Sequence, residues 1–241
     1  MKPLVIVTSA IETRFGIYDP NQRIDMTLAT IDNLRERMPG VKIAISEVSG
    51  NGLKARYEDR LMTACDYYLD FTTNYEVNWI YNNKDWFNNW DVVKNLTELT
   101  TFPQALMTIK QTGDLLGIDR VFKMSGRYQL NDKFDINLYD TPEARNKIVI
   151  GRRYPSQFPY EITLLKEQYM ARLLSWPIEM HDDMIGYYKV ARDYMKSRMM
   201  ASGYADIEHC LFYAFPKNRV MEIDEVGVYG NIAPNGMGIV N

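Results

Sequence analysis

The chain has 241 residues, of which 46% are hydrophobic and 24% charged, and these values exclude a disordered or fibrous protein. That length is sufficient for one large α/β domain or two small ones, and we expect one. The formal net charge of −3 provides no general basic field for binding nucleic acid.

The cysteine and hydropathy patterns exclude several further classes of protein. Cys65 and Cys210 lie far apart and lack the spacing of a zinc site or a disulfide framework. The apolar run at 4–7 is too short for a signal sequence, and no other run reaches membrane-spanning length. We therefore expect a soluble, cytoplasmic protein without a membrane span.

The chain opens with a strand, a helix and a second strand. The β-branched run at 4–7 predicts a buried strand. Asp19-Pro20-Asn21-Gln22 is typical of a helix start, and apolar residues then recur at helical spacing until Pro39-Gly40. Residues 41–45 form the next predicted strand. A βαβ unit of this kind requires parallel pairing of its strands with a right-handed crossover.

The middle of the chain continues the alternation. Residues 53–64 predict a short helix and residues 66–71 a third strand. The segment 72–90 is rich in aromatic residues and asparagine, and it is predicted to be a long loop. Such a loop either packs onto the domain or forms a lid or an acceptor-binding surface. A helix at 101–116 then lies behind a central strand at 121–124.

The last part of the chain is less regular. Residues 162–174 fit a strand pair or a helix equally well. The other elements predicted here are a strand at 147–150, a basic turn at 152–155, helices at 177–200 and 205–215, and a strand at 220–223. Taken together, the pattern predicts a single α/β domain with a mostly parallel, Rossmann-like sheet flanked by helices. A shift of composition near Gly151 marks a candidate sub-domain edge.

Polar residues follow the predicted strands, and they are the first candidates for a binding site. They are Thr8, Ser9 and Arg14 after the first strand, Glu47 after the second, and Ser125, Gly126, Arg127 and Tyr128 after the central one. Because a parallel sheet brings these ends to the same edge, an acid suited to ribose hydroxyls would meet arginines suited to phosphate. The alternative interpretation is that Glu47 and Arg127 are solvated charges at strand ends.

Few residues indicate a catalytic mechanism. The chain has no Gly-x-Ser-x-Gly elbow, no P-loop and no zinc-ligand spacing. Glu208 and His209 are adjacent, and a histidine beside a carboxylate is a candidate general base, metal ligand or phosphate contact. Adjacent residues on a helix point to different faces, so a direct dyad is not expected. The alternative is an ordinary pair on a helix surface.

The segment Phe122-Lys123-Met124-Ser125-Gly126-Arg127-Tyr128 is similar to the Lys-x-Ser-Gly-Arg-Tyr segment of GT-A-like glycosyltransferases, many of them viral or bacterial. The opening strand, loop and capped helix, the segment 207–212 and the segment 230–234 resemble the same group. The resemblance implies a GT-A fold that transfers a sugar from a nucleoside-diphosphate donor to an unknown acceptor. Residues 1–150 would form the nucleotide-binding half and residues 151–241 the acceptor-side half.

The resemblance also implies roles for single residues. Lys94 and Asn231 would join the strand-end residues in binding substrate, while Glu208, His209 and Asp132 are the candidate bases. Such enzymes commonly hold Mn²⁺ or Mg²⁺ with an Asp-x-Asp pair after the central strand. The present sequence has Ser125-Gly126-Arg127-Tyr128 there and no carboxylate, which leaves metal dependence open. Arg127 would then neutralise the departing diphosphate directly.

Two other functions fit the same residues. One is a non-catalytic module that binds a nucleotide or a protein on a degenerate GT-A-like fold, which agrees with the missing carboxylate pair. The other is sugar transfer to modified DNA. That function needs a basic face, and the acidic total does not favour it.

Overall fold

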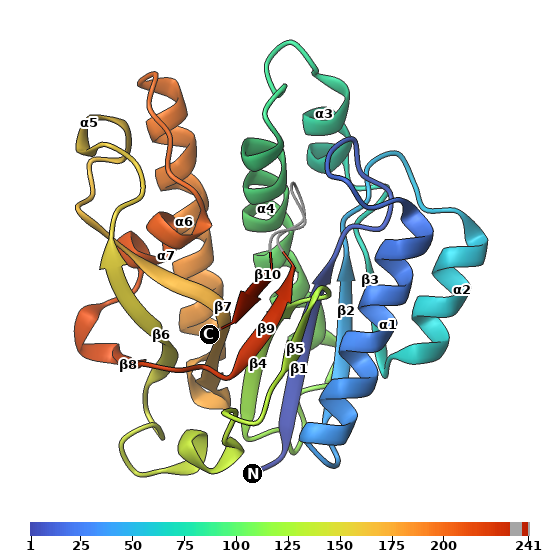
Figure 1. Ribbon diagram of the computed structural model, residues 1–241, viewed down its shortest axis with the longest axis vertical. Helices are drawn as coiled ribbons and strands as arrows, with labels where there is room; N and C mark the ends of the chain where they lie inside the picture. Colours follow the sequence, from blue (N-terminus) through green and yellow to red (C-terminus); the bar gives the residue numbers. More distant parts are fainter. Residues whose placement is uncertain (232–237, 241) are drawn as a thin grey trace.

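The computed structural model describes residues 1–231 and 238–240, which are organised around one central sheet (Figure 1). In this described part the sheet has seven strands in the order β3-β2-β1-β4-β7-β6-β8. Only β7 runs antiparallel to its described neighbours, β4 and β6, and the other pairs are parallel. The strands are β1 (Pro3–Ser9), β2 (Lys42–Glu47), β3 (Tyr67–Asp70), β4 (Arg120–Ser125), β6 (Ile148–Pro155), β7 (Glu167–Pro177) and β8 (Val220–Ile223). The predicted α/β class with a mostly parallel sheet is confirmed.

Helices cover both faces of this sheet (Figure 1). Leu4 and Ile6 of β1 pack in one hydrophobic cluster with α3, α4, α6 and α7, whereas Val5 and Val7 pack in a second cluster with α1 and α2. Because successive side chains of a strand point to opposite faces, a strand buried on both sides reads as the continuous apolar run of the sequence. The helices are α1 (Pro20–Arg37), α2 (Ala55–Ala64), α3 (Tyr75–Asn82), α4 (Trp90–Thr112), α5 (Tyr160–Thr163), α6 (His181–Met200) and α7 (Ile207–Ala214).

The start of α1 follows the predicted capping signal. The Asp19 side chain accepts hydrogen bonds from the backbone N–H groups of Asn21 and Gln22, and the Gln22 side chain accepts one from Asp19 N at 2.9 Å. Pro20 occupies the first helical position, where its missing N–H costs nothing. This reciprocal cap fixes the point at which the loop after β1 becomes a helix.

The prediction of a long loop at 72–90 was wrong. Helix α3 lies within it, capped by the Asn74 side chain, and α4 begins at Trp90, which is well before the predicted start of that helix. Asn89 caps α4 through Asp91 N at 2.9 Å. Asparagine is a strong N-cap residue, so some of the residues that suggested a loop are in fact helix starts. The aromatic residues Tyr75 and Trp86 remain about 80% exposed (81% and 79%).

The basic segment 152–155 also differs from its prediction, because it continues β6 instead of forming a turn. The ambiguous segment 162–174 contains the end of α5 and most of β7, which returns antiparallel to β6. Periodicity alone does not distinguish a buried strand from a buried helix in a short apolar run, which is why the sequence left this segment open. The predicted helices at 177–200 and 205–215 are present as α6 and α7.

A small second sheet, not predicted, lies at the C-terminal side of β4. Its order is β10-β9-β5, with β5 (Tyr128–Leu130), β9 (Val228–Asn231) and β10 (Gly238–Val240). A Cβ atom at Gly230 would lie 2.4 Å from the carbonyl oxygen of Arg127, so the two segments approach too closely for any other residue. Of the segment 230–234 in the resemblance, residues 232–234 lie outside the described residues.

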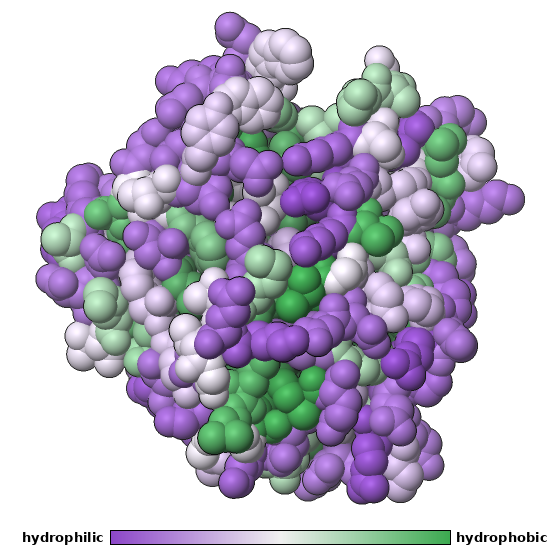
Figure 2. Space-filling model, turned by 180° about the vertical axis from the view of Figure 1, so that it is seen from behind, coloured by the Kyte–Doolittle hydropathy of each residue, from purple (hydrophilic) through white to green (hydrophobic). Residues whose placement is uncertain are grey.

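The molecular surface agrees with the ordinary charged fraction of the sequence. The face seen in Figure 2 is mostly hydrophilic, with hydrophobic side chains gathered in separate groups near its centre and lower edge. Within residues 1–231 and 238–240, no helix combines the length and the apolar character needed to cross a bilayer.

Candidate functional site

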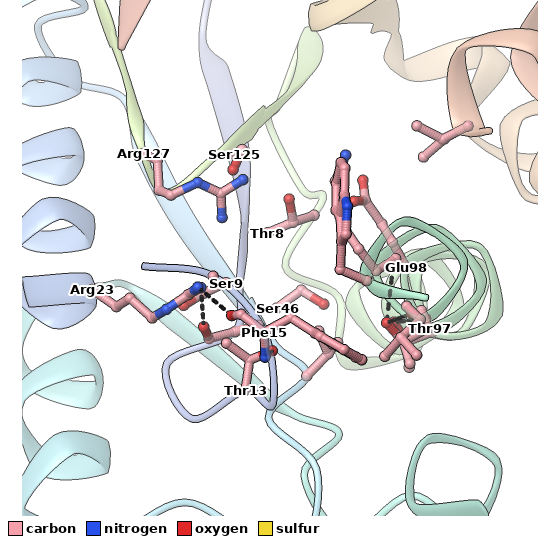
Figure 3. Close-up of a pocket in the computed structure, with 18 of the residues that line it drawn as sticks. Thr8, Ser9, Thr13, Phe15, Arg23, Ser46, Thr97, Glu98, Ser125 and Arg127 are labelled. Carbon is pink, nitrogen blue, oxygen red and sulfur yellow. Dashed lines mark hydrogen bonds between the residues drawn. The ribbon is translucent and has the colours of Figure 1, made fainter. Parts of the chain in front are cut away.

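A cavity lies beyond the carboxyl ends of β1 and β4, where ligands bind in open α/β sheets. Figure 3 shows Thr8, Ser125 and Arg127 on one side of it and Thr97 and Glu98 of α4 on the other. Residues of β7 and α7 complete the lining. The charged and hydroxyl-bearing lining residues are Thr8, Ser9, Thr13, Arg23, Ser46, Tyr81, Lys94, Thr97, Glu98, Thr101, Lys123, Ser125, Arg127, Tyr128, Arg172 and Glu208.

The predicted meeting of strand ends occurs at β1 and β4. Thr8 is the register partner of Ser125, and Gly126 N donates to Thr8 O at 2.9 Å. Gly126 lies in the turn between β4 and β5, and a Cβ atom at this position would lie 2.9 Å from Thr27 Oγ1 of α1. A glycine is therefore needed where this turn packs against the helix. This turn directs Arg127 toward the cavity, where its Nε atom is inaccessible to solvent and has no hydrogen-bond partner among the described residues.

Arg23 is a site residue that the sequence analysis missed. Its guanidinium donates to the carbonyl oxygens of Ala10, Phe15 and Tyr18 at 3.2, 2.9 and 3.0 Å, and so holds the loop after β1. Burial and the neighbouring Arg127 lower the pKa of Arg23 to about 10. A buried arginine in the first turn of α1 follows no sequence motif. The loop it organises sets one border of the cavity.

One face of α4 forms the opposite wall. Residues at helical spacing line the cavity, namely Trp90, Val93, Lys94, Thr97, Glu98 and Thr101. Glu98 forms a buried ion pair with Lys123 of β4. Burial opposes ionisation of Glu98, but Lys123 and Lys94 outweigh it and lower the pKa of this carboxyl. Lys94 is exposed and forms no ion pair or hydrogen bond with any described residue, so its charge is available to a ligand.

Glu208 brings a carboxyl group to the cavity from α7. The helix begins at Ile207 and is capped by Asp206, whose side chain accepts a hydrogen bond from His209 N at 3.0 Å. Burial and the Asp206 carboxylate raise the pKa of Glu208 to about 7, against the opposing effect of Lys94. A carboxyl group with this pKa can accept or release a proton near neutral pH, which is what general acid–base chemistry needs.

His209 is buried and is not among the residues that line the cavity. Its Nδ1 atom lies 2.6 Å from Asp206 Oδ1 and its Nε2 atom 2.8 Å from Ser156 Oγ. These three residues have the composition of a hydrolase triad. However, the Ser156 hydroxyl also bonds the carbonyl and N–H groups of Phe158 in a tight turn. The chain of bonds therefore ties α7 to the loop after β6, and it presents no free nucleophile.

Several predicted site residues lie elsewhere. Glu47 is fully buried, and its Oε1 accepts from Ile11 N at 3.1 Å and Ser49 N at 2.9 Å, so it supports the loops around the cavity. Arg14 donates to Phe87 O at 2.5 Å instead of lining the cavity. Asp132 is exposed and pairs with Arg37 of α1 at 2.7 Å. Asn231 is part of β9 and is not among the lining residues.

The lining residues fit an anion better than a divalent cation. Glu98 and Glu208 are the carboxylates among them, and Glu98 is already paired with Lys123. Arg23, Lys94 and Arg127 supply positive charge around the same space. Mn²⁺ and Mg²⁺ need several oxygen ligands with negative charge, and no group of three such residues occurs in the described chain. Among the described residues, the lining therefore does not provide a site for Mn²⁺ or Mg²⁺.

Comparison with known proteins identifies the fold. No protein-family model matches the chain, and no curated protein matches its sequence. Core-mannan synthase A (CmsA/Ktr4) from Aspergillus fumigatus, solved in its Mn/GDP form, aligns with a TM-score of 0.54 at 8% identity, covering 96% of this chain and 74% of that one.

Two structures of the galactosyltransferase LgtC align over 92% of this chain. One, with donor and acceptor sugar analogs, has a TM-score of 0.51 at 11% identity and 73% of its own chain covered. The other, an active-site mutant, has a TM-score of 0.50 at 10% identity and 72% covered. The chain therefore has the fold of the GT-A-type glycosyltransferases, as the family resemblance implied.

Proposed function

We propose that the protein transfers a glycosyl group from a nucleoside-diphosphate sugar to an acceptor hydroxyl. The observation that carries this proposal is the meeting, in one strand-end cavity of a GT-A fold, of a carboxyl group whose pKa is near neutrality with cations that have no ion-pair partner among the described residues. The GDP in the mannan synthase structure and the donor analog in that of LgtC support a donor of this class.

In this proposal Arg127 and Lys94 bind the diphosphate. A guanidinium stays charged at every physiological pH and presents a fixed fork of donors to phosphate oxygens. Thr8 and Ser125 add hydroxyl groups beside Arg127, from the ends of two neighbouring strands. Arg127 would stabilise the negative charge that develops on the diphosphate as it leaves, which is the role of a preorganised electrostatic group.

Glu208 acts as the general base. It accepts the proton of the acceptor hydroxyl while that oxygen bonds to the anomeric carbon, and the bond from this carbon to the diphosphate breaks with its electron pair going to the diphosphate. Residues 1–150 then supply most donor contacts, and residues 151–241 supply Glu208 and the acceptor side. His209 and Asp206 act through α7, by holding the helix that carries Glu208.

Calorimetric titration with UDP, GDP and their sugars, with Mn²⁺ or with EDTA, tests the binding step. We expect one nucleotide diphosphate to bind with an affinity that EDTA does not change. Incubation with the matching nucleotide sugar and a panel of acceptors then tests transfer. Failure of every nucleotide diphosphate to bind would contradict the proposal.

A non-catalytic binding module is the second candidate function. The observation that favours it is that Ser125-Gly126-Arg127-Tyr128 provides no carboxylate pair after β4. Such a module would bind the nucleotide with the same residues but release no free nucleoside diphosphate from the sugar donor under any condition. The second arm of the experiment above therefore separates the two functions.

A further inference from the structure

Arg172 reaches the cavity through an irregularity in β7. On one side, β7 pairs regularly with β4 up to Met124 and Leu173. On the other side, the pair of Ile150 with Leu174 is followed by the pair of Gly151 with Met170, so three residues of β7 have no partner in β6. Such bulges redirect side chains, and they are frequent beside active sites. Here the bulge places Ala171 and Arg172 among the lining residues.

The bulge depends on a glycine in the neighbouring strand. A Cβ atom at Gly151 would lie 2.8 Å from the carbonyl oxygen of Met170, which is closer than side chains approach a backbone. A larger residue would push the two strands apart at the point where the bulge begins. The position of Arg172 is therefore built into the sheet.

The charge of Arg172 is not used by the fold. It is half-buried, yet it forms no hydrogen bond or ion pair with any residue of the described ranges 1–231 and 238–240. By contrast, the arginines of the adjacent strand are paired on the surface. Arg152 contacts Asp224 at 3.0 Å and Arg153 contacts Glu222 at 3.0 Å. A half-buried guanidinium that lacks such a partner has a hydrogen-bonding fork available for a ligand.

Arg172 belongs to the side of the cavity that carries Glu208. Both charges act electrostatically on the Tyr154 hydroxyl, whose pKa burial raises to about 12 with further elevation from Glu208 and an opposing effect of Arg172. Arg127 and Thr8 come from the ends of β4 and β1, and Arg23 from α1. Arg127 and Lys94 together already match a doubly charged diphosphate, which leaves the charge of Arg172 without a counterpart in the donor.

We propose that Arg172 binds a second anion in the cavity, a carboxylate or phosphate group of the acceptor. The assignment of this anion to the acceptor rests on the proposed function, whereas the binding of an anion by Arg172 does not depend on it. A fork of donors from Arg172 matches two oxygens of either group. The acceptor hydroxyl then lies toward Glu208, which is the neighbouring titratable group on that side. The substrate class is an acidic or phosphorylated sugar, and a neutral sugar lacks the group that Arg172 recognises.

Ligand-observed NMR titration of the whole protein, alone and saturated with UDP or GDP, tests this site. The probes are D-glucuronate, glucose 6-phosphate and glucose, and the first two separate a carboxylate from a phosphate source. We expect at least one anionic probe to bind about tenfold or more tighter than glucose, as a charge-assisted hydrogen bond implies. Arg172→Gln should remove this preference and leave the affinity for nucleotide unchanged.

Two variants serve as matched controls. Arg172→Lys keeps the charge and should restore part of the preference, while Arg152→Gln removes an exposed arginine and should leave the preference intact. The inference is overturned if the wild-type protein binds all three probes equally, or if Arg172→Gln retains the preference. It is also overturned if Arg172→Gln weakens UDP or GDP as much as the anionic sugar, since Arg172 would then belong to the diphosphate site.

The nucleotide arm separates this inference from the proposed function. Binding of an anionic sugar through Arg172 without binding of any nucleotide diphosphate would contradict the glycosyltransferase proposal and support the anion site. Binding of nucleotide without any preference among the sugars would do the reverse.

Discussion

The two walls of the cavity are built by different means. The strand-end wall, formed by Thr8, Ser125 and Arg127, is placed by a parallel ladder and by backbone hydrogen bonds, and its cation has no carboxylate partner among the described residues. The helix wall, formed by Lys94 and Glu98 of α4 and Glu208 of α7, depends on side-chain contacts between distant segments. The first wall therefore suits permanent charge, whereas the second holds the groups whose protonation the surroundings adjust.

The largest expected effect concerns the chemistry of the helix wall. Glu208→Gln keeps the size of the side chain but removes the proton acceptor, so the rate of glycosyl transfer should fall by about 10²- to 10⁴-fold. The affinity for nucleotide diphosphate should stay within about twofold, because the proposed diphosphate ligands are Arg127 and Lys94 and not Glu208. Transfer kinetics and calorimetry measure the two quantities.

Glu179→Gln, on an exposed carboxylate, is the control for that substitution. An unchanged transfer rate in the Glu208 variant would assign the base to another residue.

The next effect concerns the stability of the helix wall. Glu98→Gln leaves the buried Lys123 without its ionic partner, and breaking a buried pair costs about 3–5 kcal/mol of unfolding free energy. Chemical denaturation measures this loss. The double variant Glu98→Gln with Lys123→Met should recover part of it, because no unpaired charge remains. A loss under about 1 kcal/mol in the single variant would mean that the pair is solvated.

The strand-end wall should respond in the opposite way. Arg127→Ala should abolish measurable donor binding or weaken it by about ten- to a hundredfold, as expected when a charged hydrogen-bond donor is lost. The melting temperature should hardly change, because Arg127 makes no ion pair with any described residue. Arg152→Ala is the matched control. A large drop in melting temperature would instead identify Arg127 as a structural residue.

The pH dependence sharpens the contrast between the walls. A base works only when deprotonated, and the pKa of Glu208 is raised to about 7. The transfer rate should therefore rise with pH through about 7 and fall about tenfold for each unit below it. Binding of the nucleotide sugar through Arg127 should stay flat over the same range, since neither a guanidinium nor a diphosphate esterified at both ends titrates there. A flat rate profile between pH 5 and 8 would contradict the role of Glu208.

The same contrast explains how much the sequence could predict. The strand-end wall was predicted because the apolar runs of β1 and β4 are local patterns, and a parallel sheet carries the carboxyl ends of such strands to one edge. The cap of α1 at Asp19 was equally local. The helix wall was only partly found. Lys94 and Glu208 were named, but the starts of α3 and α4 were missed because their capping residues, Asn74 and Asn89, were interpreted as loop residues.

Contacts between segments far apart in the chain left no signal at all. Arg172 lines the cavity only because β7 bulges between two partners. Lys123 forms its ion pair with Glu98 because α4 packs on β4. Conversely, Glu47 was chosen for its position after a strand and Asp132 through the family resemblance, yet the surroundings give both of them other partners. Position after a strand indicates where a side chain starts, and the tertiary packing decides what it contacts.

Glu47 gives the smallest effect and the sharpest check on that last point. Burial raises the pKa of its carboxyl, despite hydrogen bonds from Ser49 and Ile11 that favour the charged form. An acid whose pKa is raised by folding stabilises the protein at low pH, and this contribution is lost as pH rises through the folded value. Glu47→Gln has no charge to bury, and its amide oxygen can still accept from the same N–H groups.

The Glu47→Gln variant should therefore unfold within about 1 kcal/mol of the wild type at pH 5, and its relative stability should increase by pH 8. Glu47→Leu should lose about 1–3 kcal/mol at both pH values, because the N–H groups of Ile11 and Ser49 would be left unsatisfied. Neither change should alter the affinity for nucleotide beyond this loss of stability. If Glu47→Gln weakened nucleotide binding while the melting curve stayed the same, Glu47 would contact the ribose after all. The strand-end wall would then extend to β2.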